Sequence, residues 1–543
     1  MLEVTINAKP MVLEKPTSLL ELSKGLDKKY YAAKVNNSLK ELNSVIAESC
    51  DITFLDLTSP DSVKIYEATL RYIFLMAVKN LYPERQVRFS YSISRSIFVM
   101  PINFKIDEAF TKNVLKEMKR IISLDLAIIR KRVKRFEIID YFDELGYTDK
   151  GEIMRYRDDE YANVYECDGY KNYLYERMLP STGYIDSFKM FSYYPGIILQ
   201  YPRAELSGLL PKFVDAPRFS KHISESRKWA ELINVESISK INRQIKEKKE
   251  IDLINICETR HNRMLYEIGQ RIQENKDNIR LIAIAGPSSS GKTTFSNRLR
   301  IELLSRGIKP VKISIDDYYL PRSAAPKDID GNPDLEHIEA LDIDLFNEHI
   351  LALISGEEVT MPRFDFKTGL RVKGETIKVN PNDPIIIEGI HALNERLTAS
   401  IPRHQKFKIF IAPLQQINIC NHSPISITEI RLLRRIVRDK NYRNTDVNKT
   451  LEMWPSVRRG EFNWIYDTQE DADYIFNSEL AYEMCVMKRQ VLPMLLNIDK
   501  SSKCYSMASR LIRFLKYFED MDDTYIPCNS LIREFIGGSC FEL

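Results

Sequence analysis

The sequence predicts an α/β protein in which a mostly parallel sheet fills the C-terminal half, after a small β-rich unit and a unit of mixed α+β structure. Three observations lead to this fold class. Short β-branched strands alternate with helical patterns after residue 279, an order typical of parallel sheets covered on both faces. The first 60 residues contain short alternating segments separated by turn residues, which are typical of strands. Between these parts, segments with helical apolar spacing mix with extended ones.

Length and composition limit the class of protein. The chain has 543 residues, enough for three or four domains, and its 44% hydrophobic and 29% charged residues are typical of a soluble globular protein. The 79 Lys and Arg nearly balance the 76 Asp and Glu, leaving +3. This balance argues against an overall electrostatic grip on nucleic acid, although a local basic patch stays open.

The compartment is predicted from what the sequence lacks. No apolar run approaches the roughly 20 residues that span a bilayer, and no secretory signal is visible at the N-terminus. The eight cysteines contain no CxxC pair, so we expect reduced thiols rather than a disulfide framework or a thiolate zinc site. We therefore predict a cytoplasmic protein that does not contact a membrane.

Residues 1–60 are expected to form a ubiquitin-like β-grasp domain, because short strands surround a single helix. Asn36-Asn37 supplies a turn between two of the strands. The predicted strands are Leu2–Asn7, Met11–Glu14, Tyr31–Val35 and Asp51–Leu57, and the predicted helix is Thr17–Gly25 with Thr17 as its cap.

Residues 61–215 are expected to form an α+β domain, with helices at Ser62–Leu81 and Asp107–Leu124 and extended segments at Arg88–Val99 and Ile197–Tyr201. Residues 216–278 are then expected to form a helical linker. Its segment rich in lysine and glutamate, from residue 237 to residue 278, is interpreted as one or two solvated helices rather than as a nucleic-acid patch.

Residues 279–500 carry the predicted parallel sheet, and residues 501–543 are expected to form a C-terminal helical extension. The apolar strands of the sheet are Leu281–Ala285, Val311–Ile315, Ile385–Ile387 and Phe407–Ile411.

The most specific motif is a phosphate-binding loop that fits GxxxxGK[ST]. A strand precedes it and the helical segment Thr294–Ser305 follows it, as this loop requires. Its backbone N–H groups can surround phosphate oxygens, Lys292 can reach the β- and γ-phosphates, and the Thr293 hydroxyl can bind Mg²⁺. The loop predicts nucleotide binding but does not distinguish an ATPase, a GTPase and a kinase. The residues expected to bind the nucleotide here are Gly286, Pro287, Ser288, Ser289, Ser290, Gly291, Lys292, Thr293 and Thr294.

Two acids stand at the ends of neighbouring predicted strands. Asp316 follows the strand that ends at Ile315, and Glu388 follows Ile385–Ile387. Open α/β sheets build their sites at the carboxyl ends of strands. There a carboxylate can accept a proton from an attacking hydroxyl or hold Mg²⁺. For Asp316 the alternative is a turn or helix cap.

A predicted helix after residue 430 carries four arginines on one face, with apolar residues on the other. A polyanion that the arginines close upon would explain this cluster of like charges. The alternative is a solvated basic face. Arg443, just beyond, could extend the same lid. The four arginines are Arg431, Arg434, Arg435 and Arg438.

Together these motifs resemble the uridine kinase and phosphoribulokinase family of P-loop kinases, over about residues 280–480. The resemblance implies Asp316 as general base and Lys292 as the catalytic lysine, with Thr293, Glu388 and Asp316 around Mg²⁺. It implies Arg434, Arg438 and Arg443 as a lid on the phosphates of ATP. The residues it implies for the acceptor site are Tyr319, Glu336, Phe364, Phe366 and Arg371.

The acceptor end departs from the uridine kinase pattern. Phe364 replaces a tyrosine, and Gly369 stands where a base-reading histidine is expected. Glu336 replaces an aspartate that contacts the sugar, and Thr445 replaces a second lid arginine. A pocket without its hydrogen-bonding readers cannot be assumed to select uridine. His391, after Glu388, is a further candidate for the pocket.

The N-terminal half resembles the TGS and second additional domains of threonyl-tRNA synthetases, an arrangement that also precedes bacterial nucleoside kinase domains. The resemblance rests on segments that include residues 77–83 and 180–184 in the N-terminal half, and the tail residues 532–539 fit that arrangement too. The histidines and cysteine of the synthetase editing site are absent, and the first 221 residues contain no histidine. We therefore expect a binding or regulatory module. The positions that replace the editing residues are Ala68, Tyr72, Leu174 and Met178.

The sequence thus predicts an ATP- and Mg²⁺-dependent phosphotransferase with an alcohol acceptor, most simply the 5′-hydroxyl of a nucleoside of the uridine or cytidine type. Two alternatives stay open. One is a sugar-phosphate kinase similar to phosphoribulokinase, and the other is an RNA-binding regulatory protein that uses ATP as a switch. A weak RNA contact through the N-terminal half and a homo-oligomer are also left open, as are the exact acceptor and the choice of ATP over GTP.

Overall fold

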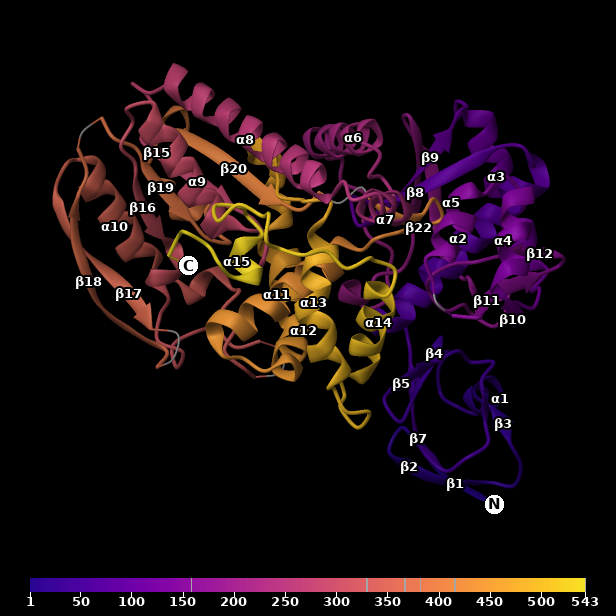
Figure 1. The fold of residues 1–543 in the computed structure, drawn as a ribbon. Coiled ribbons are helices and arrows are strands. Elements are labelled where there is room, and N and C mark those ends of the chain that lie inside the picture. The colour runs from indigo at the N-terminus through magenta and orange to yellow at the C-terminus, as the bar shows by residue number, and fades with distance from the viewer. Residues whose placement is uncertain (158, 329–330, 366–367, 381, 415–416, 543) are drawn as a thin grey trace.

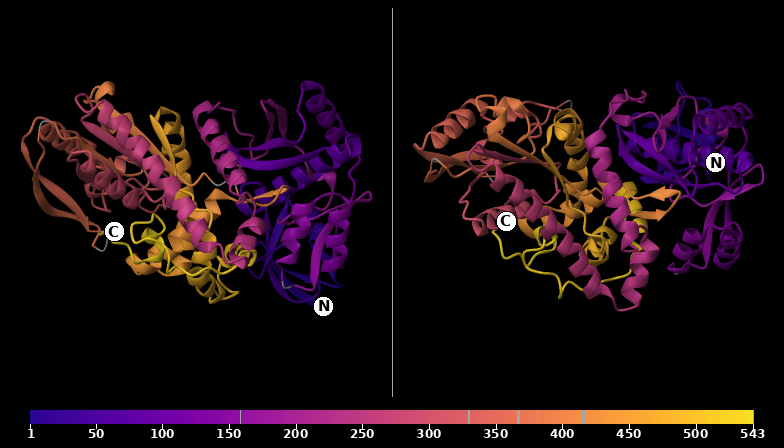
Figure 2. Two further views of the ribbon diagram at one scale, coloured as in Figure 1. Left: turned by 45° about the horizontal axis from the view of Figure 1, so that its top comes forward. Right: turned by 90° about the horizontal axis from the view of Figure 1, so that it is seen from above.

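The computed structural model describes residues 1–543 apart from 158, 329–330, 366–367, 381, 415–416 and 543. The N-terminal units lie at one end of the molecule and the parallel sheet lies at the other (Figures 1 and 2). Within the described ranges, none of the helices is both long enough and apolar enough to cross a bilayer. All eight cysteines carry free thiols.

The first unit is a five-stranded mixed sheet with the strand order β2-β1-β7-β4-β5. Its helix, Leu19–Ser23, is shorter than the predicted Thr17–Gly25, and its cap lies one residue later, because the Ser18 hydroxyl, and not Thr17, accepts the Glu21 N–H at 3.1 Å. Asn36 and Asn37 form the expected turn with positive φ. The likeness of this unit to a β-grasp domain stays a prediction. Its elements are β1 (Leu2–Ile6), β2 (Lys9–Leu13), β3 (Thr17–Ser18), α1 (Leu19–Ser23), β4 (Ala32–Val35), β5 (Ser38–Lys40), β6 (Val45–Ile46) and β7 (Cys50–Leu55).

The second unit is built on α2 (Pro60–Leu81), whose residues from Ile65 to Val78 are buried all round. The segment expected to be extended over Arg88–Val99 is a hairpin of β8 and β9, because Ser94 and Arg95 turn the chain with positive φ. The other elements are β8 (Gln86–Ile93), β9 (Ser96–Ile102), α3 (Glu108–Ser123), β10 (Ile129–Lys134), α4 (Arg135–Glu144), α5 (Thr148–Arg155), β11 (Tyr161–Cys167), β12 (Tyr170–Asn172), β13 (Lys189–Tyr193) and β14 (Gly196–Gln200).

Apolar packing fills the place where the synthetase editing residues would stand. Ala68, Tyr72, Leu174 and Met178 belong to a single buried cluster. The Tyr72 hydroxyl donates to the carbonyl oxygens of neighbouring strands. These four side chains make a packed core and offer no histidine or cysteine to a metal.

The helices between residues 217 and 274 join the C-terminal half rather than lying apart in solvent. They are α6 (Pro217–Leu232), α7 (Ile238–Lys246) and α8 (Glu250–Glu274). Ile241 of α7 and Ile268 of α8 share one apolar cluster with Ile282 of the parallel sheet. The apolar stripes of α7 and α8 are therefore covered, and only their outer faces are solvated.

The parallel sheet has the strand order β16-β19-β15-β20-β23. Alternate residues of a strand face opposite sides, so both faces of β15 are buried. Ile282 and Ile284 pack toward α9 (Lys292–Ser305) and α8, whereas Leu281 and Ala283 pack toward α10 (Ile343–Ile354) and α6. Because helices cover both faces of the sheet, most residues of these strands are buried and apolar. The strands are β15 (Leu281–Ala285), β16 (Val311–Ser314), β19 (Ile385–Glu388), β20 (Lys406–Ala412) and β23 (Tyr474–Asn477).

The remaining elements lie beside this sheet and between it and the N-terminal units (Figure 1), where β22 contacts β8. After α14 the tail is mostly irregular and ends with the one-turn helix α15. These elements are β17 (Glu358–Asp365), β18 (Leu370–Lys378), β21 (Asn418–Cys420), β22 (Ser423–Pro424), α11 (Ile427–Arg443), α12 (Val447–Trp464), α13 (Glu483–Leu496), α14 (Tyr505–Leu515) and α15 (Arg533–Ile536).

A buried ion cluster joins the second unit to the C-terminal half. Glu429, at the start of α11, accepts from Lys64 of α2 and from Arg510 of α14, and Arg510 also pairs with Asp61 at 2.9 Å. These cations lower the pKa of Glu429 to about 2 in spite of its burial. The ion cluster therefore fixes the start of α11 relative to the second unit.

Replacing Glu429 by Gln should lower the free energy of unfolding by about 3 kcal/mol at pH 7, because it leaves buried cations without their partner. A depressed carboxyl pKa stabilises the fold above the ordinary pKa near 4.5 and loses this effect as the pH falls toward 2. The difference between wild type and E429Q should therefore shrink below pH 4.5 in chemical unfolding experiments. E339Q, which breaks the exposed pair with Arg396, should change little, and an E429Q protein as stable as wild type would contradict the account.

Candidate active site

The register of the parallel strands brings three chain segments to one point. Ile284 of β15 and Ser314 of β16 both lie level with Glu388 of β19. The phosphate loop follows Ile284 by two residues and Asp316 follows Ser314 by two residues, so both reach the edge at which Glu388 ends its strand. The structure thus brings the predicted acids together beside the loop.

Two glycines of the loop are required by its shape. A Cβ on Gly286 would overlap the carbonyl oxygen of Ile411, so the loop can cross β20 here only with glycine. Gly291 has φ +92° and precedes the first residue of α9. The N–H groups of Gly291, Lys292 and Thr293 have no acceptor among the residues that the structure describes.

Polar atoms around the loop also lack partners. Ser289 Oγ, Ser290 Oγ and Thr294 Oγ1 are buried without a hydrogen bond. Unsatisfied buried hydroxyls are costly, and free amides at a helix start attract anions. Donors and acceptors of this kind fit a bound phosphate chain.

Lys292 lies between the loop and the acids. Its Nζ donates to the carbonyl oxygens of Gly286 at 3.0 Å and Pro287 at 3.3 Å. Burial lowers the pKa of Lys292, while the charges of Glu388 and Asp316 oppose this shift. Burial raises the pKa of both carboxyls, against the attraction of Lys292. The three groups therefore share one electrostatic environment.

The residues present fit a Mg²⁺ ion that has few protein ligands and whose coordination is completed by phosphate oxygens. Thr293 Oγ1 lies 3.4 Å from Glu388 Oε1, and Asp316 stands beside them. No cluster of three or more His, Cys, Asp or Glu able to hold a metal occurs within the described part of the chain. Mg²⁺ commonly takes only one or two protein ligands together with phosphates and water, so the set fits.

The arginine helix is buried, which excludes a solvated basic face. Arg431 forms a fully buried pair with Glu461 of α12. Arg434 pairs with Glu483 at 2.5 Å and points its Nη1 at the carbonyl oxygens of Ser289 and Ser290, at 3.4 and 3.5 Å. These two arginines thus contact the phosphate loop from its carbonyl side.

All three polar groups of Ser288 are held by these helices. Its N–H donates to Glu461 at 3.2 Å, and its carbonyl oxygen accepts from Arg431 at 3.2 Å. Its hydroxyl accepts from Arg435 at 2.9 Å. The position of the loop therefore depends on α11 and α12. The sequence analysis did not identify Glu461 and Glu483, the counter-ions of Arg431 and Arg434. The one available indication was that a buried cluster of arginines needs carboxylate partners.

Arg438 and Arg443 lie further along α11, toward its C-terminal end. Both face Asp439, Arg438 at 3.0 Å and Arg443 at 3.8 Å, and both lower the pKa of Asp316 against its burial. The neighbouring Arg438 and burial reduce the pKa of Arg443 to about 10. These two cations are placed beside Asp316, where the predicted lid would act.

Glu336 is the best-defined acceptor candidate. Burial raises its pKa to about 7, and the charges of Glu461 and Asp316 add to this shift. Its Oε2 is buried without a partner. Gly460 of α12 packs so closely on Glu336 that a Cβ there would overlap its side chain. An enclosed carboxyl close to Asp316 with a free oxygen fits a ligand hydroxyl.

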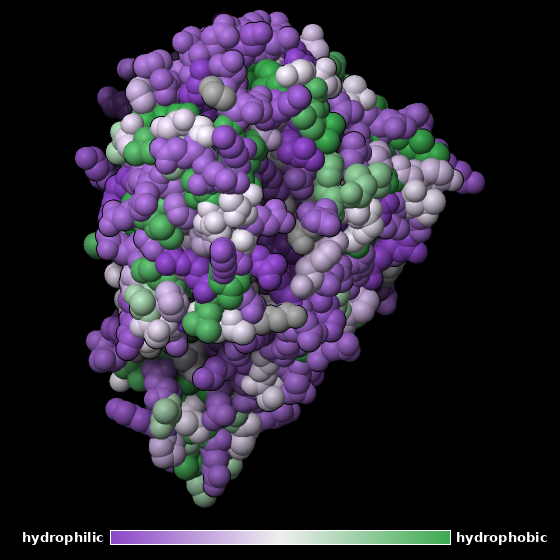
Figure 3. All heavy atoms as spheres, turned by 90° about the vertical axis from the view of Figure 1, so that its left-hand side faces the viewer, coloured by the Kyte–Doolittle hydropathy of each residue, from purple (hydrophilic) through white to green (hydrophobic). Residues whose placement is uncertain are grey.

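The other predicted acceptor residues spread around this carboxyl. The Tyr319 ring lies 5.6 Å from that of Phe364, and Arg371 pairs with Asp342 at 2.8 Å. Phe366 lies outside the described residues. Gly369 turns the β17–β18 hairpin with φ +71°, where a histidine would be strained. Figure 3 views the molecule from this side and shows a hollow lined by hydrophilic side chains.

His391 lies next to the same carboxyl residue. It is buried, and its Nε2 lies 3.0 Å from the carbonyl oxygen of Glu336. Burial reduces its pKa to about 4, so it is neutral at pH 7. Its Nδ1 has no partner, which keeps His391 a candidate for the acceptor pocket.

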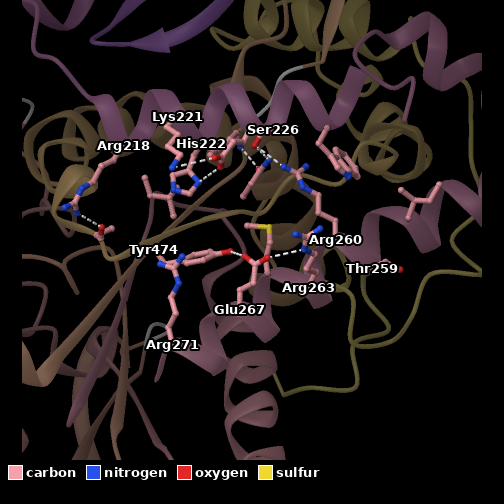
Figure 4. Close-up of a pocket in the computed structure, with 18 of the residues that line it drawn as sticks. Arg218, Lys221, His222, Ser226, Thr259, Arg260, Arg263, Glu267, Arg271 and Tyr474 are labelled. Carbon is pink, nitrogen blue, oxygen red and sulfur yellow. Dashed lines mark hydrogen bonds and ion pairs between the residues drawn. The ribbon is translucent and has the colours of Figure 1, made fainter. Parts of the chain in front are cut away.

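A separate cavity of about 1060 Å³ lies between α6, α8 and β23, away from the phosphate loop (Figure 4). Two of its cationic residues pair with acids, Lys221 with Glu225 at 4.0 Å and Arg263 with Glu267 at 3.1 Å. Arg271 lies beside the ring of Tyr474, whose hydroxyl donates to Glu267 at 3.0 Å, and Arg260 stacks on Trp229. None of the lining residues belongs to the loop or carries the predicted acids.

The comparisons with known proteins concern the C-terminal half of the chain. Residues 281–481 match the sequence model of the phosphoribulokinase / uridine kinase family. The uridine kinase of Bacillus pumilus strain SAFR-032 is 30% identical over 217 residues, which cover 39% of this chain and 94% of that protein. The uridine kinase of Ureaplasma parvum serovar 3 is 31% identical over 178 residues, which cover 33% and 77%.

A solved structure described as a possible uridine kinase from Bacillus stearothermophilus has 20% identity and a TM-score of 0.23, covering 37% of this chain and 89% of that one. The match to this family shows that the C-terminal half is a phosphotransferase domain of the kind that acts on a hydroxyl acceptor. The chain belongs to the phosphoribulokinase and uridine kinase family, and residues 1–280 lie outside the family match.

Replacing Glu461 by Gln should weaken ADP binding and lower the unfolding temperature together, because Arg431 loses its buried counter-ion and the Gln side chain turns an NH2 group toward the donors of Arg431 or Ser288. Isothermal titration calorimetry and thermal unfolding measure the two effects. The matched control is E452Q, an exposed glutamate on the same helix, which should leave both unchanged. An unaltered affinity in E461Q would show that the loop does not need this contact.

Proposed function

We propose that the protein is an ATP- and Mg²⁺-dependent kinase that phosphorylates a sugar hydroxyl, specifically the 5′-hydroxyl of a nucleoside. The observation that carries this proposal is the convergence of Asp316 and Glu388 on Lys292 and Thr293. In this proposal Asp316 takes the proton of the acceptor alcohol, a role that a simple ATPase would not require. The names of the relatives support the nucleoside as acceptor.

Each group has a role in this proposal. The free amides of the loop bind the β-phosphate, and Lys292 leaves its carbonyl acceptors to bind the β- and γ-phosphates. Asp316 accepts the proton of the attacking hydroxyl, and Arg438 and Arg443 offset charge on the transferred group. Mg²⁺, held by Thr293 and Glu388, would neutralise phosphate charge. In-line transfer then requires mainly positioning and electrostatics.

Glu336 is proposed to orient the acceptor. Its free carboxylate oxygen can accept hydrogen bonds from vicinal sugar hydroxyls while Tyr319 and Phe364 enclose the sugar and base. Because Gly369 has replaced the base-reading histidine, the base is read less strictly than in a uridine kinase. The N-terminal half is proposed to be a TGS-like and synthetase-like binding module, with its domain limits at residues 60 and 215.

An acceptor panel tests the proposal. ADP release should be stimulated by one or more nucleosides, and the product should carry the phosphate on the 5′-oxygen. A panel of nucleosides, ribulose 5-phosphate and pantothenate separates the acceptor classes. Stimulation by ribulose 5-phosphate alone would overturn the nucleoside assignment, and stimulation by none, with ADP still bound, would overturn the kinase assignment for these acceptors.

Asp316→Asn should lower kcat by about 100-fold or more, because the hydroxyl loses its general base. ADP affinity should change little, since Asp316 does not form the phosphate cradle. Steady-state kinetics and calorimetry measure the two quantities. The control D344N alters an exposed acid on α10 and should keep wild-type kinetics. If D316N turned over near the wild-type rate, the role of Asp316 would be wrong.

The acceptor KM should rise as the pH falls below about 7, because a carboxyl with a pKa raised to about 7 becomes protonated there and accepts hydrogen bonds less well. E336Q should have a high acceptor KM that no longer changes over this range, with an unchanged KM for ATP. Kinetics between pH 6 and 8.5 measure this dependence. A wild-type profile retained in E336Q would exclude Glu336 as its source.

A further inference from the structure

The C-terminal tail lies on the phosphate loop, although it comes about 240 residues later and outside the family match. The Leu531 side chain packs against Gly291, the last residue before α9. α15 lies beside α11 (Figure 1), with the Phe535 ring 5.1 Å from the Arg434 guanidinium. The tail is therefore part of the wall of the nucleotide site.

Glu534 makes the direct contact with the site. Its Oε2 accepts the N–H of Thr294 at 2.9 Å, and its side chain is buried. Thr294 is the third residue of α9, where a backbone N–H has no partner within the helix and can bind a phosphate oxygen. A carboxylate of this chain thus uses a donor that belongs to the phosphate cradle.

The charge of Glu534 reaches the catalytic groups. It raises the pKa of Lys292 against burial and adds to the raised pKa of Glu388. No Lys or Arg among the described residues forms an ion pair with Glu534. A buried carboxylate that forms no close ion pair would repel the phosphates of a nucleotide that approaches the same helix end.

The backbone around Glu534 is anchored independently. Asn441 donates to the carbonyl oxygen of Phe535 and Gln490 donates to that of Ile536, both at 3.0 Å. Arg533 pairs with Asp523 at 2.8 Å. Because these bonds do not involve the Glu534 carboxylate, that side chain can leave Thr294 while the segment stays in place.

We propose that Glu534 is a nucleotide-site residue that sets the affinity for the nucleotide by competing with its phosphates for the Thr294 N–H. This inference rests on the proposed function, because it requires the loop to bind a nucleotide. Binding then displaces the carboxylate from α9. The tail thereby holds the affinity below what the loop alone would give.

The competition predicts a gain in affinity when the charge is removed. A hydrogen bond to a carboxylate is stronger than one to a neutral amide oxygen, so E534Q should bind ADP roughly tenfold more tightly than wild type. E534D keeps the charge but is one methylene shorter, and its affinity should lie between the two. A capping role alone would lower the unfolding temperature of E534Q without tightening ADP binding, and a contact to the ribose would weaken binding.

Calorimetric titration of the full-length protein with ADP, with and without Mg²⁺, tests the proposal. The control is E519Q, which removes a tail glutamate paired with Lys246 at the surface and should bind ADP as wild type does. Tighter binding in E534Q supports the competition, and equal or weaker binding overturns it. If neither wild type nor E534Q binds ADP, the proposed function fails as well, whereas binding by wild type with no gain in E534Q overturns only the inference about Glu534.

Discussion

The site depends on the register of three neighbouring parallel strands, which brings their carboxyl ends to the same height in the sheet. β19 lies between β16 and β15, and its last residue, Glu388, stands beside Ser314 and Ile284. A shift of either register by one residue would turn Asp316 or the loop to the other face of the sheet. The apolar packing on both faces prevents this shift, because it fixes which side chains point toward α9 and which toward α10. The chemistry therefore rests on the packing of Ile282 and Ile386 as much as on the acids.

A second constraint holds the loop from behind. Ser288 is fixed by Glu461, Arg431 and Arg435, and α11 carries these two arginines. The same helix begins at Glu429, in the ion cluster with α2 and α14. One rigid helix thus connects the second unit to the phosphate loop. A ligand that moves α2 would act on the loop through α11, which gives the N-terminal half a physical route to the site.

Much of the sheet and the loop could be predicted from the sequence, because β-branched strands with an acid or a glycine loop at their ends have a strong pattern. The start of α1 could not, since both Ser18 and Thr17 can cap a helix and the path of the chain decides between them. The arginines of α11 were recognised as a cluster, but their partners come from α12 and α13. The contact of Glu534 with the start of α9 could not be predicted either, because no local sequence pattern indicates that the tail packs against that helix. Phe366 lies outside the described residues, and its role stays a prediction.

A crystal structure with a non-hydrolysable ATP analogue and Mg²⁺ would show whether the nucleotide binds at the carboxyl edge of the parallel sheet. We expect the β-phosphate on the amides of Gly291, Lys292 and Thr293, the metal between Thr293 and Glu388, and the γ-phosphate facing Asp316. We also expect that the Glu534 carboxylate has left the Thr294 N–H. An analogue bound elsewhere, with Lys292 still on the carbonyl oxygens of Gly286 and Pro287, would contradict the account.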